Sequence, residues 1–226
     1  MQQLEFRTGV ISPVECMKEG FELIKSDYWL MLAISLVGAL IGGISMMVLT
    51  GAMICGTFYC YLRKIDGEPV KFDDLWKGMQ WLVPGLVVMA IIIIQILFVY
   101  AAFYISFIVA AVMGSKLDEG ELLGLFVGMV VVELIVLTLM VCLHTLLIFT
   151  FPLIADKNVG AVQAIKTSVR AALKNLGGVA GLMGLNFVLV FAGYLAFCVG
   201  IYFVIPIITA GNVVAYRRVF PRSAYR

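Results

Sequence analysis

Residues 28–62, YWLMLAISLVGALIGGISMMVLTGAMICGTFYCYL, decide the fold of this chain. The stretch runs for 35 residues without a charged side chain. As a single helix it would be about 52 Å long, whereas the hydrocarbon core of a bilayer is about 30 Å thick. We therefore expect a helical hairpin that turns near Gly42 and Gly43. Residues 176–216 are too long for one crossing in the same way, and 193–200 is the expected turn.

The distribution of basic residues predicts which ends of the spans share a side. Fifteen of the 16 Lys and Arg residues lie in alternate gaps between apolar stretches, and the exception is Lys116. Because cytoplasmic segments near spans are rich in Lys and Arg, both termini are predicted to be cytoplasmic. With 63% hydrophobic residues and a mean hydropathy of +1.08, residues 1–226 are expected to form a single integral membrane domain. The predicted fold is an all-α polytopic bundle with six spans at about 28–44, 46–62, 84–113, 122–151, 176–195 and 199–216.

Three segments on the predicted cytoplasmic side have the periodicity of amphipathic helices, at about 13–26, 71–80 and 160–174. Ser12, Pro13 and Glu15 fit an N-cap, a first-turn proline and a capping-box acid at the start of the first. These helices could lie on the membrane surface or pack on the cytoplasmic end of the bundle. Their apolar stripes are Val14, Met17, Phe21 and Ile24; Phe72, Leu75, Trp76 and Met79; and Val162, Ile165, Val169 and Ala172.

An internal repeat is indicated by two copies of this layout. Shifting the first apolar stripe by 148 positions superposes it on the third, and Lys18 then coincides with Lys166. The hairpin after each stripe ends with the same order of residue types. The two sets are Gly56, Tyr61 and Arg63, and Gly211, Tyr216 and Arg218. Both copies begin in the cytoplasm, so duplication would give a parallel repeat, although common demands on such a unit could also produce the pattern.

Three short motifs carry a resemblance to a known group of proteins. They are GEPVKFDDL at 67–75, FPLIAD at 151–156 and AYRRVF at 215–220. With the overall layout, they resemble a family of uncharacterised bacterial multi-pass membrane proteins. That family is distantly similar to the membrane domain that accompanies some glycerophosphodiester phosphodiesterases. The resemblance implies a six-helix domain in the bacterial inner membrane; it does not carry the phosphodiesterase activity over, because these residues include no such soluble domain.

A few polar residues fall inside the predicted spans. Glu133 needs the most explanation, because an acidic side chain at mid-bilayer costs about 2.5 to 3.5 kcal/mol on insertion scales. Counting from the assumed span ends places Gln95, Glu133 and Asn186 at a similar depth, so we expect that they could meet. His144 lies on the same helical face as Glu133, nearer the cytoplasm, at a depth like that of Asn212.

Two interpretations of these residues stay open. In the first, Glu133 and His144 begin a proton or cation path, because both can change charge and lie about 16 Å apart on one helix face. In the second, Glu133 is protonated or bonded to Gln95 or Asn186 and ties helices together. We favour the second, because a wet pathway needs more polar groups than these.

Other motifs point away from catalysis. The sequence has no glycine-rich phosphate loop, HExxH motif or nucleophile elbow, and the spacing of its five cysteines and one histidine predicts no metal site. We expect no cofactor, no enzymatic activity and, with a net charge of +2, no nucleic-acid partner. Glycines at four-residue spacing would let helices approach closely within the chain or, less favoured, in a partner interface. These pairs are Gly38 and Gly42, Gly124 and Gly128, and Gly177 and Gly181.

The leading hypothesis is a membrane protein that acts by binding lipids or other membrane subunits, as a scaffold, an assembly subunit or a lipid-organising protein. The alternative is a small transporter or channel, with the Gln95, Glu133 and Asn186 layer at its centre and His144 on the cytoplasmic side.

Overall fold

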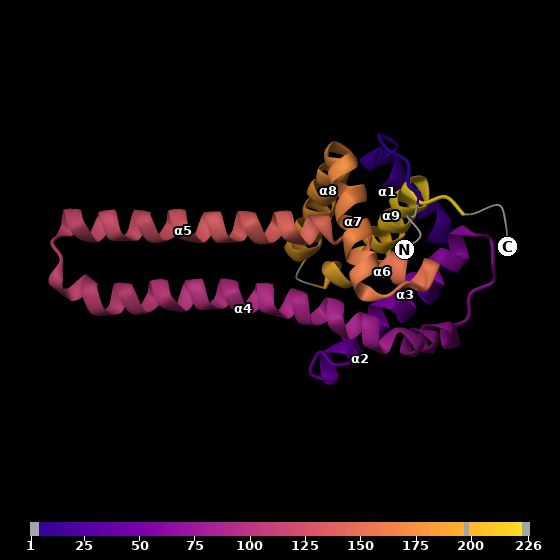
Figure 1. The fold of residues 1–226 in the computed structure, drawn as a ribbon, viewed down its shortest axis with the longest axis horizontal. Helices are drawn as coiled ribbons and strands as arrows, with labels where there is room; N and C mark the ends of the chain where they lie inside the picture. The colour runs from indigo at the N-terminus through magenta and orange to yellow at the C-terminus, as the bar shows by residue number, and fades with distance from the viewer. Residues whose placement is uncertain (1–4, 197–198, 223–226) are drawn as a thin grey trace. The chain divides into compact units, whose positions relative to one another are not determined.

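The computed structural model describes residues 5–196 and 199–222, and within these ranges the regular structure is entirely helical (Figure 1). Short 3₁₀ helices join several longer helices. The elements are α1 Pro13–Ile24, η1 Lys25–Asp27, α2 Tyr28–Ile44, α3 Thr50–Ile65, η2 Phe72–Trp81, α4 Leu82–Met113, η3 Gly114–Lys116, α5 Glu119–Leu146, α6 Thr150–Lys157, α7 Ala161–Lys174, α8 Leu176–Leu195 and α9 Gly200–Val219.

Five helical runs among the described residues are long and apolar enough to cross a membrane. They are Pro13–Ile44, Phe72–Met113, Glu119–Lys157, Leu176–Leu195 and Gly200–Val219. The chain therefore has the composition and helix lengths of a membrane protein. The expected span 46–62 corresponds to α3, which has 16 residues and a length of about 24 Å, and it is not among the five.

The helix boundaries differ from the expected ones at two turns. The first hairpin turns at 45–49, where Met46 and Met47 have positive φ angles of 49° and 71°, so Gly42 and Gly43 remain helical. The expected fourth span, 122–151, is not one helix, because α5 ends at Leu146 and α6 starts after a turn. The third turn agrees better: α8 ends at Leu195 and α9 starts at Gly200, while residues 197 and 198 lie outside the described ranges.

The described chain groups into two compact units. The first unit contains residues 1–89 and 145–226, and the second contains residues 90–144. Within the second unit, the helical parts of α4 and α5 run antiparallel (Figure 1).

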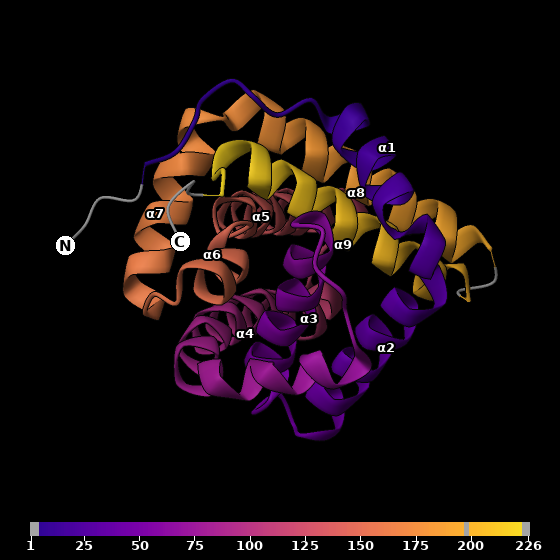
Figure 2. The same cartoon turned by 90° about the vertical axis from the view of Figure 1, so that its right-hand side faces the viewer.

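Helix α3 lies in the middle of the first unit, against α2, η2 and α6 (Figure 2). Glycines make this close packing possible. A Cβ added to Gly56 would lie 2.2 Å from the carbonyl oxygen of Leu75 in η2, and one added to Gly51 would lie 2.3 Å from that of Gly85 in α4. Both distances are too short for real atoms, so only glycine fits at either crossing. On the α2 side, Tyr61 is fully buried and its hydroxyl bonds to Ser35 at 2.9 Å.

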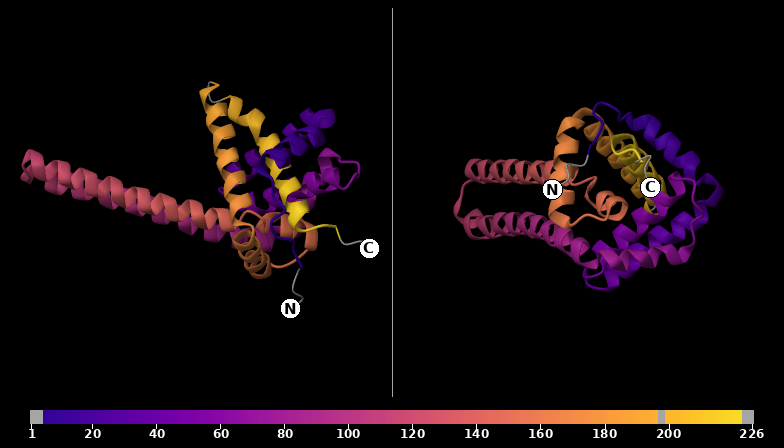
Figure 3. Two further views of the ribbon diagram at one scale, coloured as in Figure 1. Left: turned by 90° about the horizontal axis from the view of Figure 1, so that it is seen from above. Right: turned by 45° about the vertical axis from the view of Figure 1, so that its right-hand side comes forward.

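Helices α8 and α9 form an antiparallel pair, which is seen from above in Figure 3. Helix α1 lies along α9, where Gly20 and Gly211 meet. Pro206 lies inside α9 and has no N–H to donate to the preceding turn. Nearby, the carbonyl oxygen of Phe203 accepts a 2.6 Å hydrogen bond from the hydroxyl of Tyr28 in α2, which ties the two hairpins together.

Helices form over all three segments expected to be amphipathic, but their buried faces differ from the expected stripes. Met17 and Ile24 of α1 are buried, whereas Val14 and Phe21 are exposed. In η2, Leu75 is buried. Helix α7 departs most, because its buried face consists of small residues, Ala161, Ala164, Ser168, Ala171 and Ala172, so only the last member of its expected stripe is buried. Small side chains fit there because they allow close helix contacts.

The two copies of the glycine, tyrosine and arginine pattern have matching surroundings. In α3, Gly56 contacts η2, Tyr61 is buried and Arg63 pairs with Asp74 of η2 at 2.9 Å. In α9, Gly211 contacts α1, Tyr216 is buried and Arg218 pairs with Glu15 and Glu19 of α1 at 3.1 and 2.6 Å. Each pattern therefore lies where another helix, η2 or α1, packs against the second helix of a hairpin. The expected equivalence of α1 and α7 is not reflected in these contacts, because α1 packs on α9 and α7 packs on α6.

Candidate functional site

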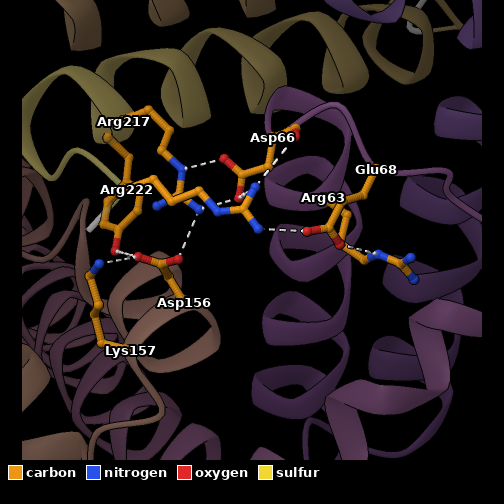
Figure 4. Close-up of polar contacts among 8 residues, drawn as sticks. Arg63, Asp66, Glu68, Asp156, Lys157, Arg217 and Arg222 are labelled. Atoms are coloured by element: carbon orange, nitrogen blue, oxygen red, sulfur yellow. Dashed lines mark hydrogen bonds and ion pairs between the residues drawn. The ribbon is translucent and has the colours of Figure 1, made fainter. Parts of the chain in front are cut away.

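A group of charged side chains gathers where α3, α6 and α9 end, and we call it the charged cluster (Figure 4). The sequence places basic residues in the last turn of each of these helices, where they also complement the partial negative charge of a helix C-terminus. Acidic residues from the α3–η2 connection and from α6 complete the group. The members of the charged cluster are Arg63, Asp66, Glu68, Asp156, Lys157, Arg217 and Arg222.

Arg217 is the centre of the charged cluster. Its Nε and Nη2 donate to the two carboxylate oxygens of Asp66 at 3.0 and 2.7 Å, and Nη2 also donates to Asp156 at 2.8 Å. The side chains of Arg217, Asp66 and Asp156 are 10%, 13% and 12% exposed, respectively. A guanidinium group has the planar, two-pronged geometry that such paired contacts need. Arg217 thus joins α9 to the ends of α3 and α6.

Asp156 is held by two further donors. The hydroxyl of Tyr216 donates to it at 2.7 Å, and the ammonium group of Lys157 lies 3.1 Å away. The ring of Tyr216 is fully buried and stacks with Phe220, and Phe149 packs against both rings. Because these rings pack tightly in the core, they hold the hydroxyl in place and, through it, the carboxylate of Asp156.

The rim of the charged cluster is more exposed. Glu68 accepts hydrogen bonds from Arg222 at 2.7 Å and from Arg63 at 3.2 Å. The hydrogen bond from Arg222 is the main reason why the pKa of Glu68 lies below its usual value, and the bond from Arg63 acts in the same direction. Arg63 also pairs with Asp74, which links the rim to η2.

The charged cluster lines a cavity of about 300 Å³. Tyr59 and Asn158 complete part of its wall. Asn158 has a positive φ of 50° and ends α6, and its Oδ1 accepts a 2.9 Å hydrogen bond from the indole nitrogen of Trp81 at the end of η2. The cavity wall is therefore fixed to η2 as well as to the three helix ends.

Sequence reasoning did not predict the charged cluster as a site. Its members come from three segments, and Asp66 and Arg217 are 151 positions apart. A signal was nevertheless available, because the three motifs of the family resemblance supply Glu68, Asp156 and Arg217. The sequence alone indicates no chemical role for these motifs.

The polar residues predicted to share one depth are dispersed. In the second unit, Glu133 accepts a hydrogen bond from Ser106 at 3.1 Å. Gln95 precedes Ser106 by eleven residues, about 16 Å along α4. Because α5 runs antiparallel, the residue level with Gln95 is eleven positions after Glu133, and that residue is His144. The predicted meeting of Gln95 and Glu133 is therefore wrong.

Asn186, the third member of the predicted layer, has a different partner. Its Nδ2 donates to Oδ1 of Asn212 at 3.1 Å, so this amide pair joins α8 to α9. The two asparagines were expected to lie at different depths in the membrane. Oδ1 of Asn186 and Oε1 of Gln95 are buried without a hydrogen-bond partner among the described residues. Of the predicted residues, Asn186 and Asn212 thus pair with each other, whereas Glu133 pairs with Ser106, which was not among them.

The cysteines and acids offer no metal-binding arrangement in the part of the chain that the structure describes, where no three His, Cys, Asp or Glu side chains are grouped suitably. Cys16, Cys55 and Cys60 are buried and Cys142 is exposed, while Cys198 lies outside the described residues. Comparison of the chain with protein-family models, with curated proteins and with solved structures finds no match. A function for this chain therefore has to be inferred from its structure.

Proposed function

We propose that this chain is a non-enzymatic integral protein of a bacterial inner membrane, and that it acts by binding, as a scaffold, an assembly subunit or a lipid-organising protein. In this proposal the chain crosses the membrane six times and both termini are cytoplasmic. The distribution of Lys and Arg supports this topology.

The sixth crossing in this proposal is α3. At about 24 Å it is shorter than the hydrocarbon core, and local thinning of the bilayer would accommodate the mismatch. Helices α1, η2 and α7 would lie at the cytoplasmic interface. Their exposed apolar side chains, which include Phe21, Trp76 and Val162, support such a position because they would otherwise face water.

The observation that carries the binding function is the apolar surface of the second unit. Val130, Val131 and Val132 of α5 are 41%, 49% and 50% exposed in the isolated chain. Consecutive helical residues point about 100° apart, so this exposure is not confined to one face. Lipid could cover such a surface, but Glu133 adds a carboxyl group with one hydrogen bond among the described residues, which is costly in hydrocarbon.

Two glycines on α5 favour a protein partner over lipid alone. A Cβ added to Gly124 or Gly128 would meet nothing within 4 Å. Small residues at this spacing let helices approach closely in membranes, and polar side chains then bond across the contact. A helix of a partner subunit could therefore pack on α5 at these glycines, which lie roughly on the opposite side of the helix from Glu133.

The alternative, a transporter or channel, has less support. It requires Gln95, Glu133 and Asn186 to line one hydrated path, whereas Glu133 and Asn186 bond to other residues. Glu133 also lies in an apolar cavity of about 360 Å³ with Phe103, Phe107 and Phe126. These surroundings favour a structural role for the carboxyl group.

We also infer that the matching contacts of α3 with η2 and of α9 with α1 derive from a duplicated unit. The two copies place the same residue types in the same relation: a glycine at the crossing, a buried tyrosine and an arginine paired with an acid. A duplication of this kind would have produced two docking positions for amphipathic helices.

Co-purification tests the binding function. The tagged chain, expressed in a bacterial host and extracted in mild detergent, is expected to migrate with a membrane partner. Gly128→Leu should reduce this association, because the leucine side chain covers the helix surface that Gly124 and Gly128 leave open. Gly184→Leu is a matched control on α8, where an added Cβ also meets nothing within 4 Å. Glu133→Gln should keep the association, because residue 133 lies on the other side of α5 from Gly124 and Gly128.

A different result would favour transport. A stable, partner-free monomer that moves a solute across liposomes, with flux abolished by Glu133→Gln, would replace the binding function with transport.

A further inference from the structure

The cavity of the charged cluster has more positive than negative groups. Four cationic side chains and three carboxylates line it. The cations are Arg63, Lys157, Arg217 and Arg222, and the acids are Asp66, Glu68 and Asp156. Asp74 and Lys77, which pair with each other just outside the cavity, leave this balance unchanged. The cavity therefore has an excess of one positive charge.

The acids already have donors, whereas several donors are unused. Each of the three carboxylates interacts with at least two basic side chains. In contrast, Nε of Arg222 has no hydrogen-bond partner among the described residues, and the ion pair with Asp156 leaves Lys157 with further N–H donors. Oδ1 of Asn158 accepts from Trp81, so its Nδ2 remains available. A ligand that fits this lining must supply acceptor oxygens.

The ends of three helices oppose this preference, because each C-terminus has a partial negative charge. That effect declines within the last turn of a helix. Arg222 extends beyond it, because it lies three residues after the end of α9 and its side chain is 49% exposed. Lys157 is in the last turn of α6, where its full positive charge exceeds the partial negative charge of the helix end. The charges on these two side chains therefore dominate for a ligand that enters from the surface.

We propose that this cavity binds a phosphate group, with Lys157, Arg222 and Asn158 as its principal contacts. Charge-assisted hydrogen bonds from lysine and arginine are the usual means of holding phosphate in proteins. Two sources could provide the group: the headgroup of an anionic phospholipid, or free phosphate. The site does not require the partner proposed for the second unit, so the two ideas can fail separately.

The surroundings of the cavity show how a lipid could reach it. Tyr59 lines the cavity, and Arg63 and Lys77 lie 5.9 and 5.3 Å from the centre of its ring. Lys77 belongs to η2, which also exposes Trp76 and Met79. An aromatic and apolar surface beside a basic cavity is typical of a position at the headgroup region of a membrane.

Calorimetric titration of the purified chain in a neutral detergent tests the site. The probes are a short-chain phosphatidylglycerol, a short-chain phosphatidylcholine and inorganic phosphate. Lys157→Gln and Arg222→Gln should each weaken binding of the anionic probe about tenfold, as expected for loss of one charge-assisted contact. Lys166→Gln on α7 removes an exposed positive charge that does not line the cavity and should have no effect. If either Lys157→Gln or Arg222→Gln fails to fold, the affinity of the other variant tests the site.

The arms of the titration separate the two sources. Saturable binding of phosphatidylglycerol that inorganic phosphate does not displace identifies a lipid headgroup, whereas binding of inorganic phosphate with the same dependence on Lys157 and Arg222 identifies free phosphate. Either result supports the site. Wild-type affinity in both cavity variants, no saturable binding of either anionic probe, or equal binding of phosphatidylcholine that neither variant weakens would overturn it.

Discussion

Gly20 of α1 and Gly211 of α9 meet so closely that a Cβ added to Gly20 would lie 2.5 Å from the backbone nitrogen of Gly211. The neighbouring atom belongs to the backbone, so it cannot move aside as a flexible side chain would. This contact holds α1 against α9, and it brings Arg218 within reach of Glu15 and Glu19. The position of the first amphipathic helix thus depends on two residues that lack side chains.

Replacing Gly20 with alanine should therefore destabilise the protein. Overpacking of this kind costs about 2 kcal/mol, and more when backbone must shift. In thermal unfolding of the detergent-solubilised protein, we expect a lower midpoint for Gly20→Ala. Gly184→Ala is the matched control on α8, where the new methyl group meets nothing within 4 Å, and it should be neutral or slightly stabilising. Equal midpoints for the two variants would show that α1 does not pack on α9 in this way.

Two neighbouring arginines provide a second comparison. Arg217 is nearly buried between Asp66 and Asp156, whereas Arg218 pairs with Glu15 and Glu19, whose side chains are more than half exposed. Removing one partner from a buried group of charges costs about 3 to 5 kcal/mol, and removing a surface pair costs about 1 kcal/mol or less. Arg217→Met should thus lower the free energy of unfolding far more than Arg218→Met. If denaturant titrations gave similar losses of unfolding free energy for the two variants, the burial of Arg217 and the exposure of the Arg218 pairs would be contradicted.

The sequence predicted the helices well because their signal is local. Long uncharged runs locate α2, α4, α8 and α9 within a few residues, since hydrophobicity and charge act on each segment by itself. Relative depth is not local. Counting from assumed span ends placed Gln95 beside Glu133, whereas the hairpin places Ser106 there. The register of two antiparallel helices depends on the turn between them and on their tilt. The amino-acid composition of the helices determines neither.

The charged cluster was missed for a related reason. Asp66, Asp156 and Arg217 look like ordinary residues at helix ends, where acids and bases are common. Only the packing of α3, α6 and α9 brings them together, and the same holds for Asn186 and Asn212. A search for acids and bases at the predicted cytoplasmic ends of different spans could have indicated the cluster.

Acid should weaken the rim of the charged cluster. Hydrogen bonds from Arg222 and Arg63 lower the pKa of Glu68 in the folded chain from its ordinary value of 4.5. A carboxylate of this kind stabilises the fold above its unfolded pKa, and the contribution disappears as the pH falls through the lower, folded pKa. Glu68→Gln should therefore reduce the unfolding midpoint at pH 7, and the difference from wild type should shrink below about pH 4.5. A difference that is constant from pH 7 to pH 3 would exclude this ion pair as its cause.

The six-span topology can be tested by cysteine labelling in intact cells. Residue 118 lies in the connection between α4 and α5, which should face outward, and residue 166 lies on α7, which should face the cytoplasm. A membrane-impermeant maleimide should label Asp118→Cys in intact cells but reach Lys166→Cys only after permeabilisation. The native Cys16, Cys55 and Cys60 are buried, so they should contribute little background labelling. Both variants are made in a chain that carries Cys142→Ser, and labelling of that chain alone measures the background. If α3 does not cross the membrane, five crossings place the chain ends on opposite sides, and residues 118 and 166 still differ.

A cysteine in the amino-terminal segment distinguishes five crossings from six, because α3 lies between it and residue 118. Glu22→Cys on the exposed face of α1 should behave like Lys166→Cys if the chain crosses six times. With five crossings it would instead be labelled together with Asp118→Cys, since the number of spans between the two positions would then be even. This second outcome would retain the helical fold and the charged cluster, but it would remove α3 from the set of spans and reverse the predicted side of α1.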